Sequence, residues 1–206
     1  MSLRRRFFRW LAVRNPRYDG LYRRFGRPSG REWAELRKER GDFYSMGEFC
    51  SINPHCTLEG GPLIKFGNNV RLAECYVCAH DGSVNMINRA YGLTLDNVGK
   101  IEFRDNVFVG FGAIILPGVT IGPNAIVSVG SVVRSDVAEG DVVSGVPAKR
   151  VGRLDMTVAM LKAKNEKFPW KHLIEKRASE YDAAMEPELQ RLRTIFFHGA
   201  EKPPRA

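Results

Sequence analysis

Apolar residues recur every six positions through the middle of this 206-residue chain. Steps of six from Phe103 reach only apolar side chains, and the residue four places after each is small or β-branched. The two series are Phe103, Val109, Ile115, Ile121, Val127, Val133 and Val107, Ala113, Val119, Ala125, Ser131, Val137. For a chain with 44% hydrophobic residues, chance gives the first series a probability of about 0.04 over the six phases. The period therefore indicates a structural repeat.

A six-residue period matches neither a helix, which repeats every 3.6 residues, nor a single strand, which alternates every two. It suits one short strand followed by one turn, repeated many times. Three such units close a triangular coil, and successive coils stack at about 4.8 Å through backbone hydrogen bonds. The sequence therefore predicts an all-β solenoid in which the inward residues form columns.

The same phase continues upstream with two interruptions. The inward series there is Met46, Ile52, Leu58, then Phe66, Leu72, Cys78, and the companion series is Cys50, Cys56, then Val70, Tyr76. Gly60-Gly61 shifts the phase by two residues. Residues 84–100 lose the phase altogether, so we expect a loop excursion there, and such insertions often form the binding face of a solenoid.

Helical spacing replaces the six-residue period at both ends of the chain. Leu3, Phe7, Trp10 and Leu11 share one face of a basic helix that Asn15-Pro16 should end. After Gly152 the apolar spacing predicts two or three further helices. We therefore expect a basic helical arm over residues 1–40, a solenoid over residues 41–153 and a helical extension over residues 154–206.

The net charge of +9 lies entirely in the arm. Residues 1–40 hold 13 Lys and Arg against 4 Asp and Glu, and the rest of the chain holds 19 of each. A basic tail on a neutral domain argues against nucleic-acid binding. The arm could cap the end of the solenoid or contact an anionic membrane surface, and the sequence leaves both open.

No run of about eighteen apolar residues occurs, and the apolar stretch at residues 10–13 is too short for a signal-peptide core. These observations predict a cytoplasmic protein, associated with the inner membrane surface if the arm binds lipid. Four reduced cysteines are then expected. Cys50 and Cys56 fit as small buried hydrophobes, and Cys75 and Cys78 form an isolated CxxC without a partner motif, so no metal is predicted.

Residues 106–151 resemble the hexapeptide-repeat acetyltransferases, a family that includes sugar, maltose, galactoside and antibiotic acetyltransferases. The resemblance is carried by ILPGVTIG at residues 115–122, by SVGSVV at residues 128–133 and by GVPAK at residues 145–149. It covers roughly residues 41–153. It implies a left-handed parallel β-helix, acetyl-CoA as the acetyl donor, and a homotrimer whose active sites are completed by neighbouring subunits.

His80 is the candidate catalytic base. Transfer of an acetyl group to a hydroxyl needs a group that takes the proton, and histidine is suited to this near neutral pH. His80 lies in CAHDGS at residues 78–83, directly before the excursion, and sugar O-acetyltransferases carry a similar His-Asp-Gly. Asp81 either orients the imidazole or belongs only to an Asp-Gly turn. Asn85, Arg89 and Tyr91 are candidate acceptor contacts, with ordinary loop polarity as the alternative.

The donor site is assigned only by the resemblance. The pantetheine arm would pass Gly110, Phe111 and Gly112, then Val129 and Gly130, then Arg134 and Ser135, and the nucleotide end would lie near Pro147 and Lys149. The expected reaction is acetylation of a hydroxyl or amino group of a sugar, in cell-surface polysaccharide or glycolipid assembly. The alternatives are an antibiotic acetyltransferase of the streptogramin or chloramphenicol type and a non-catalytic β-helix scaffold.

Overall fold

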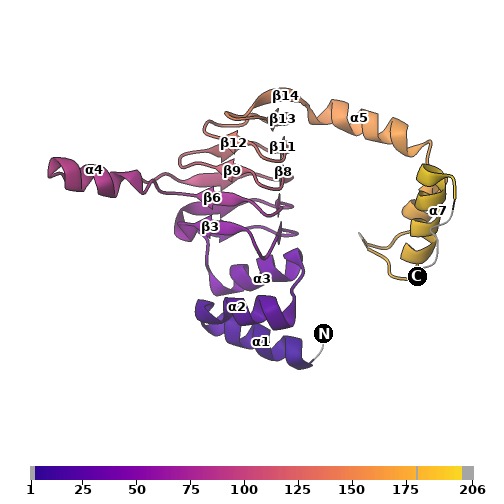
Figure 1. Ribbon diagram of the computed structural model, residues 1–206, viewed down its shortest axis with the longest axis horizontal. Coiled ribbons are helices and arrows are strands. Elements are labelled where there is room, and N and C mark those ends of the chain that lie inside the picture. Colours follow the sequence, from indigo (N-terminus) through magenta and orange to yellow (C-terminus); the bar gives the residue numbers. More distant parts are fainter. Residues whose placement is uncertain (1–2, 180, 201–206) are drawn as a thin grey trace. The chain divides into compact units, whose positions relative to one another are not determined.

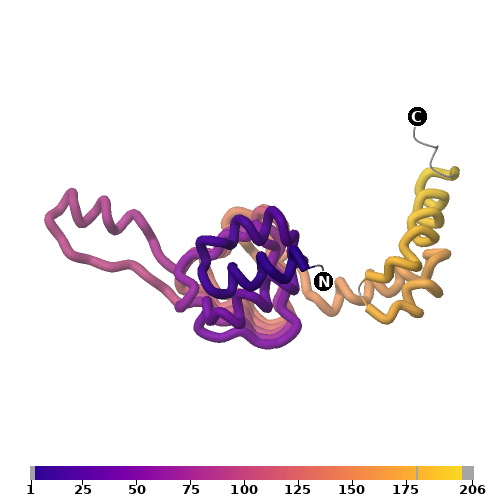
Figure 2. The backbone as a smooth tube through the Cα atoms, turned by 90° about the horizontal axis from the view of Figure 1, so that it is seen from below, coloured from indigo at the N-terminus to yellow at the C-terminus, as the bar shows by residue number. Residues whose placement is uncertain are grey.

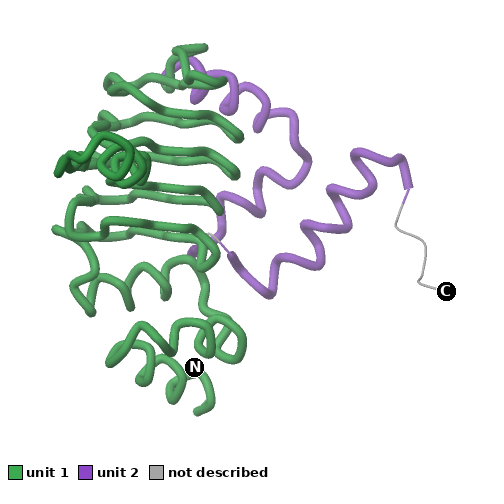
Figure 3. Tube along the Cα trace, turned by 60° about the vertical axis from the view of Figure 1, so that its left-hand side comes forward, with its two compact units in different colours: residues 1–154 green, residues 155–206 purple. Residues whose placement is uncertain are grey.

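A computed structural model describes residues 3–179 and 181–200. The chain divides into two compact units, residues 1–154 and residues 155–206 (Figure 3). None of the described helices is both long enough and apolar enough to cross a bilayer.

The first unit is built on three sheets, and its first twelve strands belong to them in rotation. The coils that these strands form are stacked in Figure 1. Sheet A holds β1 (Ser45–Met46), β4 (Ile64–Phe66), β7 (Ile101–Phe103) and β10 (Thr120–Ile121). Sheet B holds β2 (Ser51–Ile52), β5 (Arg71–Leu72), β8 (Val107–Val109), β11 (Ala125–Val127), β13 (Asp141–Ser144) and β14 (Lys149–Arg153). Sheet C holds β3 (Thr57–Glu59), β6 (Tyr76–Cys78), β9 (Ile114–Ile115) and β12 (Val132–Val133). All pairings are parallel except the closing hairpin of β13 and β14. The three parallel sheets fit the left-handed β-helix that the resemblance implies.

The inward columns follow the six-residue period. The register aligns Met46, Phe66, Phe103 and Ile121 in sheet A, Ile52, Leu72, Val109, Val127 and Val143 in sheet B, and Leu58, Val77, Ile115 and Val133 in sheet C. The companion series from Val107 to Val137 is buried at every position. The predicted repeat is therefore confirmed over residues 103–137.

The expected inward positions of Cys78 and Tyr76 are wrong. Val77 is the fully buried residue that pairs with Leu58 and Ile115, and Cys78 follows it on the outer side of the strand. The physical reason is that the step from the inward Leu72 to the inward Val77 is five positions, one fewer than the period of six. The inward positions of this coil therefore shift by one residue. Alternation along a strand then turns Tyr76 and Cys78 outward.

Asparagines shape the corner between sheets A and B. Asn69, Asn106 and Asn124 have φ values of 54°, 59° and 56°, in the left-handed region that asparagine tolerates better than most residues. Their side chains also bond to one another, from Asn69 to Asn106 at 3.0 Å and from Asn106 to Asn124 at 2.9 Å. The ladder stabilises three successive coils in register.

Five short helical segments precede the first coil and close the end of the solenoid. They are α1 (Leu3–Arg14), a 3-10 turn (Pro16–Tyr18), α2 (Asp19–Leu21), a π-helical turn (Tyr22–Gly26) and α3 (Gly30–Arg40). Ser29 and Glu32 form a reciprocal capping box at the start of α3. α3 contacts β2 and buries Trp33, Ala34 and Leu36. α3 is therefore the element that covers the first coil.

α1 packs on this cap with a different face from the one its apolar stripe suggests. Ala12 is fully buried, and Phe8 and Val13 pack against the core. The helix is held by ion pairs from Arg5 to Glu32 and from Arg9 to Glu39, both reaching residues of α3. The arm does cap the solenoid, but these pairs turn the stripe of Leu3, Phe7 and Trp10 away from the protein, as their exposure shows.

We expected a loop over residues 84–100, and this is wrong for the first half of the segment. That half belongs to the helix α4 (Ser83–Tyr91). Asn88 fixes the tip of this excursion by bonding both the N–H and the carbonyl of Leu95, each at 2.8 Å. α4 and the returning segment project away from the three sheets (Figures 1 and 2). No side chain of α4 is buried.

The second unit contains the expected helices, α5 (Leu154–Asn165), α6 (Lys171–Glu175) and α7 (Glu186–His198). An aromatic cluster forms its core, with Phe168 and Trp170 stacked at 4.5 Å and both contacting Phe196. Leu189 of α7 is also fully buried. The helices begin and end near Pro169 and Pro187, as the sequence indicates.

Asp42 joins the arm to the first coil. Its carboxylate accepts from Arg37 Nε at 2.7 Å and from Arg40 Nε at 2.6 Å, and Arg40 also bonds Asp19 and the Ala12 carbonyl. Burial alone would raise the pKa of Asp42, but the bonds from Arg40 and Arg37 outweigh it and leave the pKa below its ordinary value. The ionised carboxylate therefore stabilises the cap.

We predict that Asp42→Asn lowers the free energy of unfolding at pH 7 by about 2 kcal/mol, because Arg37 loses its carboxylate partner and Arg40 keeps only Asp19. A carboxylate with a lowered folded pKa stabilises above its unfolded pKa, so the difference from wild type should shrink as the pH falls below about 4. Urea unfolding between pH 3 and 7 measures both. Glu48→Gln, which breaks the exposed Lys38–Glu48 pair, should cost under about 0.5 kcal/mol and serves as the control.

Candidate active site

His80 lies where the excursion leaves the solenoid. The two ends of the excursion pair there: His80 forms a β-bridge with Val98, and Asp81 N–H donates to the Asn97 carbonyl at 2.9 Å. One position further in, Gly99 N–H donates to the Ala79 carbonyl at 2.9 Å. The backbone of His80 is thus fixed on both sides, while 46% of its side chain remains exposed. The imidazole is both positioned and accessible.

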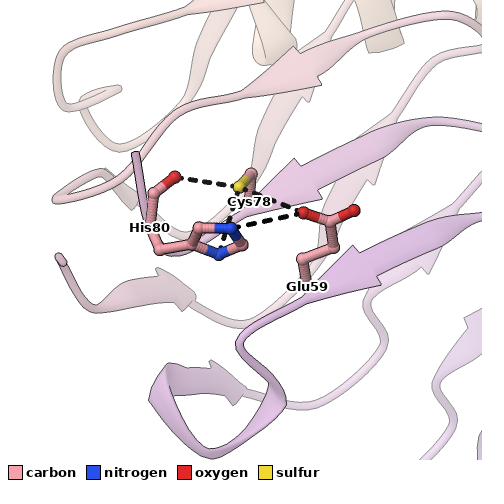
Figure 4. A group of neighbouring side chains, drawn as sticks. All are labelled: Glu59, Cys78 and His80. Carbon is pink, nitrogen blue, oxygen red and sulfur yellow. Dashed lines mark hydrogen bonds and ion pairs between the residues drawn. The ribbon is translucent and has the colours of Figure 1, made fainter. Parts of the chain in front are cut away.

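Three side chains from adjacent strand ends meet at this point (Figure 4). His80 Nε2 lies 3.7 Å from Glu59 Oε2, and His80 Nδ1 lies 3.6 Å from Cys78 Sγ. The Cys78 thiol also lies 3.6 Å from Glu59 Oε2 and donates to the His80 carbonyl at 3.0 Å. Because Glu59 and Cys78 are register partners on β3 and β6, the sheet itself brings these groups together.

Tyr76 holds the Glu59 carboxylate in place. Its hydroxyl donates to Glu59 Oε2 at 2.9 Å, and Tyr76 is two residues before Cys78 on the same outer side of β6. Interactions with the Cys78 thiol and with the Glu59 carboxylate raise the pKa of the Tyr76 hydroxyl. Tyr76 therefore stays protonated near neutral pH and keeps its bond to Glu59.

The carboxylate beside the imidazole is that of Glu59, whereas the Asp81 carboxylate bonds to other groups. The Asp81 carboxylate accepts from Ser83 N–H at 2.9 Å and from Asn97 Nδ2 at 3.1 Å, which ties together the two ends of the excursion. The Ser83 N–H holds the pKa of Asp81 below its ordinary value. These bonds fit the alternative interpretation of Asp81-Gly82, in which Asp81 belongs to a turn at the start of the excursion.

The same cluster offers one possible ligand atom each from Glu59, Cys78 and His80, all within 4.8 Å of one another. Imidazole nitrogen, thiolate sulfur and carboxylate oxygen are the ligand types that zinc takes in proteins. A tetrahedral site would need a fourth ligand. The absence of a metal stays a prediction, and the experiments below test it.

The structure places the three candidate acceptor residues on α4 rather than around the imidazole. Asn85 lies in the first turn of the helix, whereas Arg89 and Tyr91 lie in its last turn, toward the tip of the excursion. All three are exposed, Tyr91 to 75%. Within one chain the helix that carries these residues projects away from the solenoid (Figure 2).

Most of the candidate donor residues stack at the corner between sheets B and C. Gly112 N–H donates to the Glu74 carbonyl at 2.7 Å and Gly130 N–H to the Phe111 carbonyl at 2.8 Å, so successive turns lie directly on one another. Gly112 and Gly130 have φ values of 68° and 65°, which these tight turns require. Gly110 packs against the backbone of the Val129 turn and leaves no room for a Cβ.

This corner presents an apolar column with a cation near its end. Phe111, Val129 and Val146 are 62%, 68% and 73% exposed on consecutive turns. Pro147 follows in the last of these turns, and Lys149 begins β14 directly after it, with its side chain exposed. The column runs along the solenoid axis.

Arg134 and Ser135 lie at a different corner. They follow β12 where the chain turns from sheet C to sheet A, the same corner at which His80 follows β6. Both are exposed. The width of sheet C, two or three residues or roughly 10 Å, separates them from the apolar column. One chain therefore divides the candidate donor residues between two corners.

Glu59 and Tyr76 are the site residues that sequence reasoning missed. Glu59 stands just before the Gly60-Gly61 interruption, and Cys78 stands just before the excursion. An alignment of these two coils on their interruptions would therefore have put Glu59 beside Cys78. The assumed phase, which put Cys78 and Tyr76 inside the solenoid, hid this signal.

Comparisons with known proteins agree with this architecture. A family model described as bacterial transferase hexapeptide (six repeats) matches residues 101–135. Protein CapG of Staphylococcus aureus is 34% identical over 151 residues, which are 73% of this chain and 79% of that protein. Galactoside O-acetyltransferase of Lactococcus lactis is 42% identical, covering 51% of this chain and 60% of that protein.

The crystal structure of a maltose O-acetyltransferase from Clostridium difficile 630 is 28% identical, with a TM-score of 0.46, over 53% of this chain and 58% of that one. The chain spans about half the length of other curated relatives that it matches. The match covers 53% of one acetyltransferase-like yeast protein and 55% of another.

Proposed function

Because the chain belongs to the hexapeptide-repeat acetyltransferase family, we propose that it transfers an acetyl group from acetyl-CoA to a hydroxyl group of a sugar. An amino group is the alternative acceptor atom, and assembly of cell-surface polysaccharide or glycolipid is the setting we propose. The observation that carries the proposal is the half-exposed imidazole of His80, which has a fixed backbone and a carboxylate beside its ring.

His80 acts as the general base. It takes the proton of the acceptor hydroxyl as the hydroxyl oxygen attacks the thioester carbonyl. The carbon–sulfur bond then breaks, and the imidazolium returns the proton to the departing sulfur. The products are the acetyl ester and the free thiol of CoA, so His80 ends the cycle in its starting state.

Glu59 stabilises the imidazolium that forms between these two proton transfers. At 3.7 Å from Nε2 the carboxylate is beyond direct hydrogen-bond length, but it is close enough for an electrostatic effect. A negative group on the Nε2 side also favours the tautomer with hydrogen on Nε2. Nδ1 is then the nitrogen that accepts the proton, and Tyr76 keeps Glu59 in position.

The apolar column supplies a surface for the pantetheine arm of acetyl-CoA. Phe111, Val129 and Val146 can contact its methylene and methyl groups, and the exposed Lys149 can pair with nucleotide phosphates. Phe111 lies on the coil next to that of His80, so the thioester end of a donor on this column would lie at the level of the base along the solenoid axis. The residues present thus fit the donor substrate.

A homotrimer would complete the site. The corner with His80, Arg134 and Ser135 and the corner with the apolar column lie on opposite sides of sheet C, so one chain does not enclose a donor between them. In a threefold assembly of parallel solenoids, the first corner of one chain can face the second corner of its neighbour. The unburied α4 would then contact the adjacent chain and bring Asn85, Arg89 and Tyr91 to an acceptor.

We predict a graded loss of turnover from three substitutions. His80→Ala should reduce kcat by about 10²- to 10⁴-fold, the usual contribution of a positioned base. Glu59→Gln should reduce it by roughly tenfold or more, because the imidazolium loses its counter-charge. Asp81→Asn, the matched carboxylate-to-amide control, should have a smaller effect. Steady-state kinetics with release of free thiol gives kcat and KM for each enzyme.

A positioning role for Glu59 requires that KM for acetyl-CoA stays near the wild-type value and that Glu59→Asp restores part of kcat. Near-normal turnover of His80→Ala would remove the assignment. EDTA should leave wild-type turnover unchanged. A loss that is restored by Zn²⁺ would instead assign Glu59, Cys78 and His80 to a metal.

We predict that two inactive variants restore activity when they share a trimer. His80→Ala removes the base, and Val129→Glu places a charge in the apolar column at an exposed position. If base and column come from different chains, co-expression in equal amounts should give about one quarter of wild-type activity by random assembly. Light scattering should show three chains per particle. An active monomer, or co-expressed variants that remain inactive, would contradict the shared site.

We predict that the acceptor is found among sugars. Wild-type protein would be incubated with acetyl-CoA and a panel of nucleotide sugars, glycolipids and antibiotics, and each product's mass would be read together with free thiol. A mass increase of one acetyl group on a sugar, absent with His80→Ala, is the expected result. Acetylation confined to the antibiotics would favour the alternative function. The absence of both a product and thermal stabilisation by CoA would favour a non-catalytic scaffold.

A further inference from the structure

We propose that the outer face of α1 docks this protein on the surface of an anionic lipid bilayer. The inference rests on the geometry of α1 alone, so it goes beyond the proposed reaction and does not depend on it. The occupant is lipid rather than nucleic acid or a second protein chain, for the reasons below.

Three large apolar side chains form an exposed stripe on α1. Leu3, Phe7 and Trp10 are 84%, 54% and 51% exposed. They lie at spacings of four and three residues, so they share one side of the helix, and the Phe7 and Trp10 rings stack with their centroids 6.3 Å apart. The buried Ala12 and the packed Phe8 lie on the opposite side, which joins α1 to the cap. The stripe is therefore apolar surface that residues 3–179 and 181–200 leave exposed.

The arginines around this stripe are the ones that lack an acidic partner. Arg5 and Arg9, nearer the packed side, pair with Glu32 and Glu39. Arg6 and Arg14 are exposed, and no carboxylate pairs with either of them in the described part of the chain. The Arg14 guanidinium lies 3.8 Å from the centre of the Trp10 ring, and Arg4 lies over Phe25 at 5.1 Å. Positive charge is thus concentrated at the edges of the apolar stripe.

A hollow beside Trp10 adds a place for an anionic group. It is lined by Arg6, Arg9 and Arg14 together with Trp10, Val13 and Glu39. Three guanidinium groups outnumber the single carboxylate, which Arg9 already binds. A lipid phosphate fits this charge, while the neighbouring Phe7 and Leu3 would enter the region where headgroups meet acyl chains.

This combination favours a bilayer over other partners. α1 holds five arginines and no acidic residue, so it offers positive charge and apolar surface together, which an anionic bilayer complements. A nucleic acid would leave the three apolar side chains without a partner. At a bilayer surface, aromatic rings and arginine side chains both find a favourable depth, with rings at the headgroup level and guanidinium groups at the phosphates.

The helix is already formed and fixed to α3, so binding needs no folding step. In a threefold assembly, the same end of each solenoid lies on the same side. Three stripes would then face one membrane, which raises the overall affinity above that of one helix.

The test is binding of the full-length protein to vesicles of phosphatidylcholine alone and of phosphatidylcholine with 30% phosphatidylglycerol, at low and high salt. We expect binding to the anionic vesicles at low salt and release by high salt. Trp10 is the exposed tryptophan, whereas Trp33 and Trp170 are buried, so a blue shift of tryptophan emission on binding should disappear in Trp10→Phe.

Two matched double variants distinguish an effect of the outer face of α1 on vesicle binding from an effect of the protein's net charge. Arg6→Glu with Arg14→Glu should weaken binding to anionic vesicles at least about tenfold, since each basic residue near the surface contributes about 1 kcal/mol. Arg104→Glu with Lys162→Glu changes the net charge equally at exposed positions elsewhere and should bind within about twofold of wild type. All four side chains are exposed, so melting temperatures should stay unchanged.

Three results would overturn the proposal. They are wild-type protein that does not bind anionic vesicles at low salt, equal weakening by both double variants, and a Trp10 blue shift that appears with rising protein concentration in the absence of vesicles. The last would assign the stripe to a second copy of this chain. Loss of acetyl transfer in the His80 variants has no bearing on vesicle binding, so failure of the proposed reaction remains distinguishable.

Discussion

Parallel backbone hydrogen bonding between successive coils is the constraint on which this structure depends. Strands β1 to β12 have only two or three residues each and are too short to be stable alone. They persist because each pairs with strands of neighbouring coils. Pairing in register puts equivalent residues of successive coils next to each other. Inward apolar side chains therefore form continuous columns. Asparagines at the corner bond to the equivalent asparagines on the next coil. A side chain's neighbours are therefore set by its place in the coil, more than by its neighbours in sequence.

The candidate active site arises where this regularity is interrupted. The coil between β3 and β6 is one residue out of phase, which turns Tyr76 and Cys78 outward, opposite the end of β3. Immediately afterwards the chain leaves the solenoid and returns, and the paired ends of that excursion hold His80 against Glu59. The sheet thus fixes the backbone that carries His80, while the projecting helix α4 has no buried side chain.

The arm shows how one amphipathic helix can serve two surfaces. Its ion pairs with α3 and its small buried side bind it to the cap, and this leaves the large apolar side chains and unpaired arginines outside. Capping and lipid contact were alternatives in the sequence, yet they use different sides of α1 and are compatible in the structure.

The sequence by itself determined the repeat, the inward columns over residues 103–137, the end of α1 and the helical end of the chain. It also made His80 the candidate base, which stays a prediction. These features are local, because burial on a strand or helix leaves a period that can be read along the chain. The tertiary structure decided that Glu59 and not Asp81 lies beside the imidazole, that Val77 and not Cys78 points inward, and which side of α1 packs. Each of these depends on contacts between coils or helices, and one residue more or less in a turn changes them without altering the period on either side.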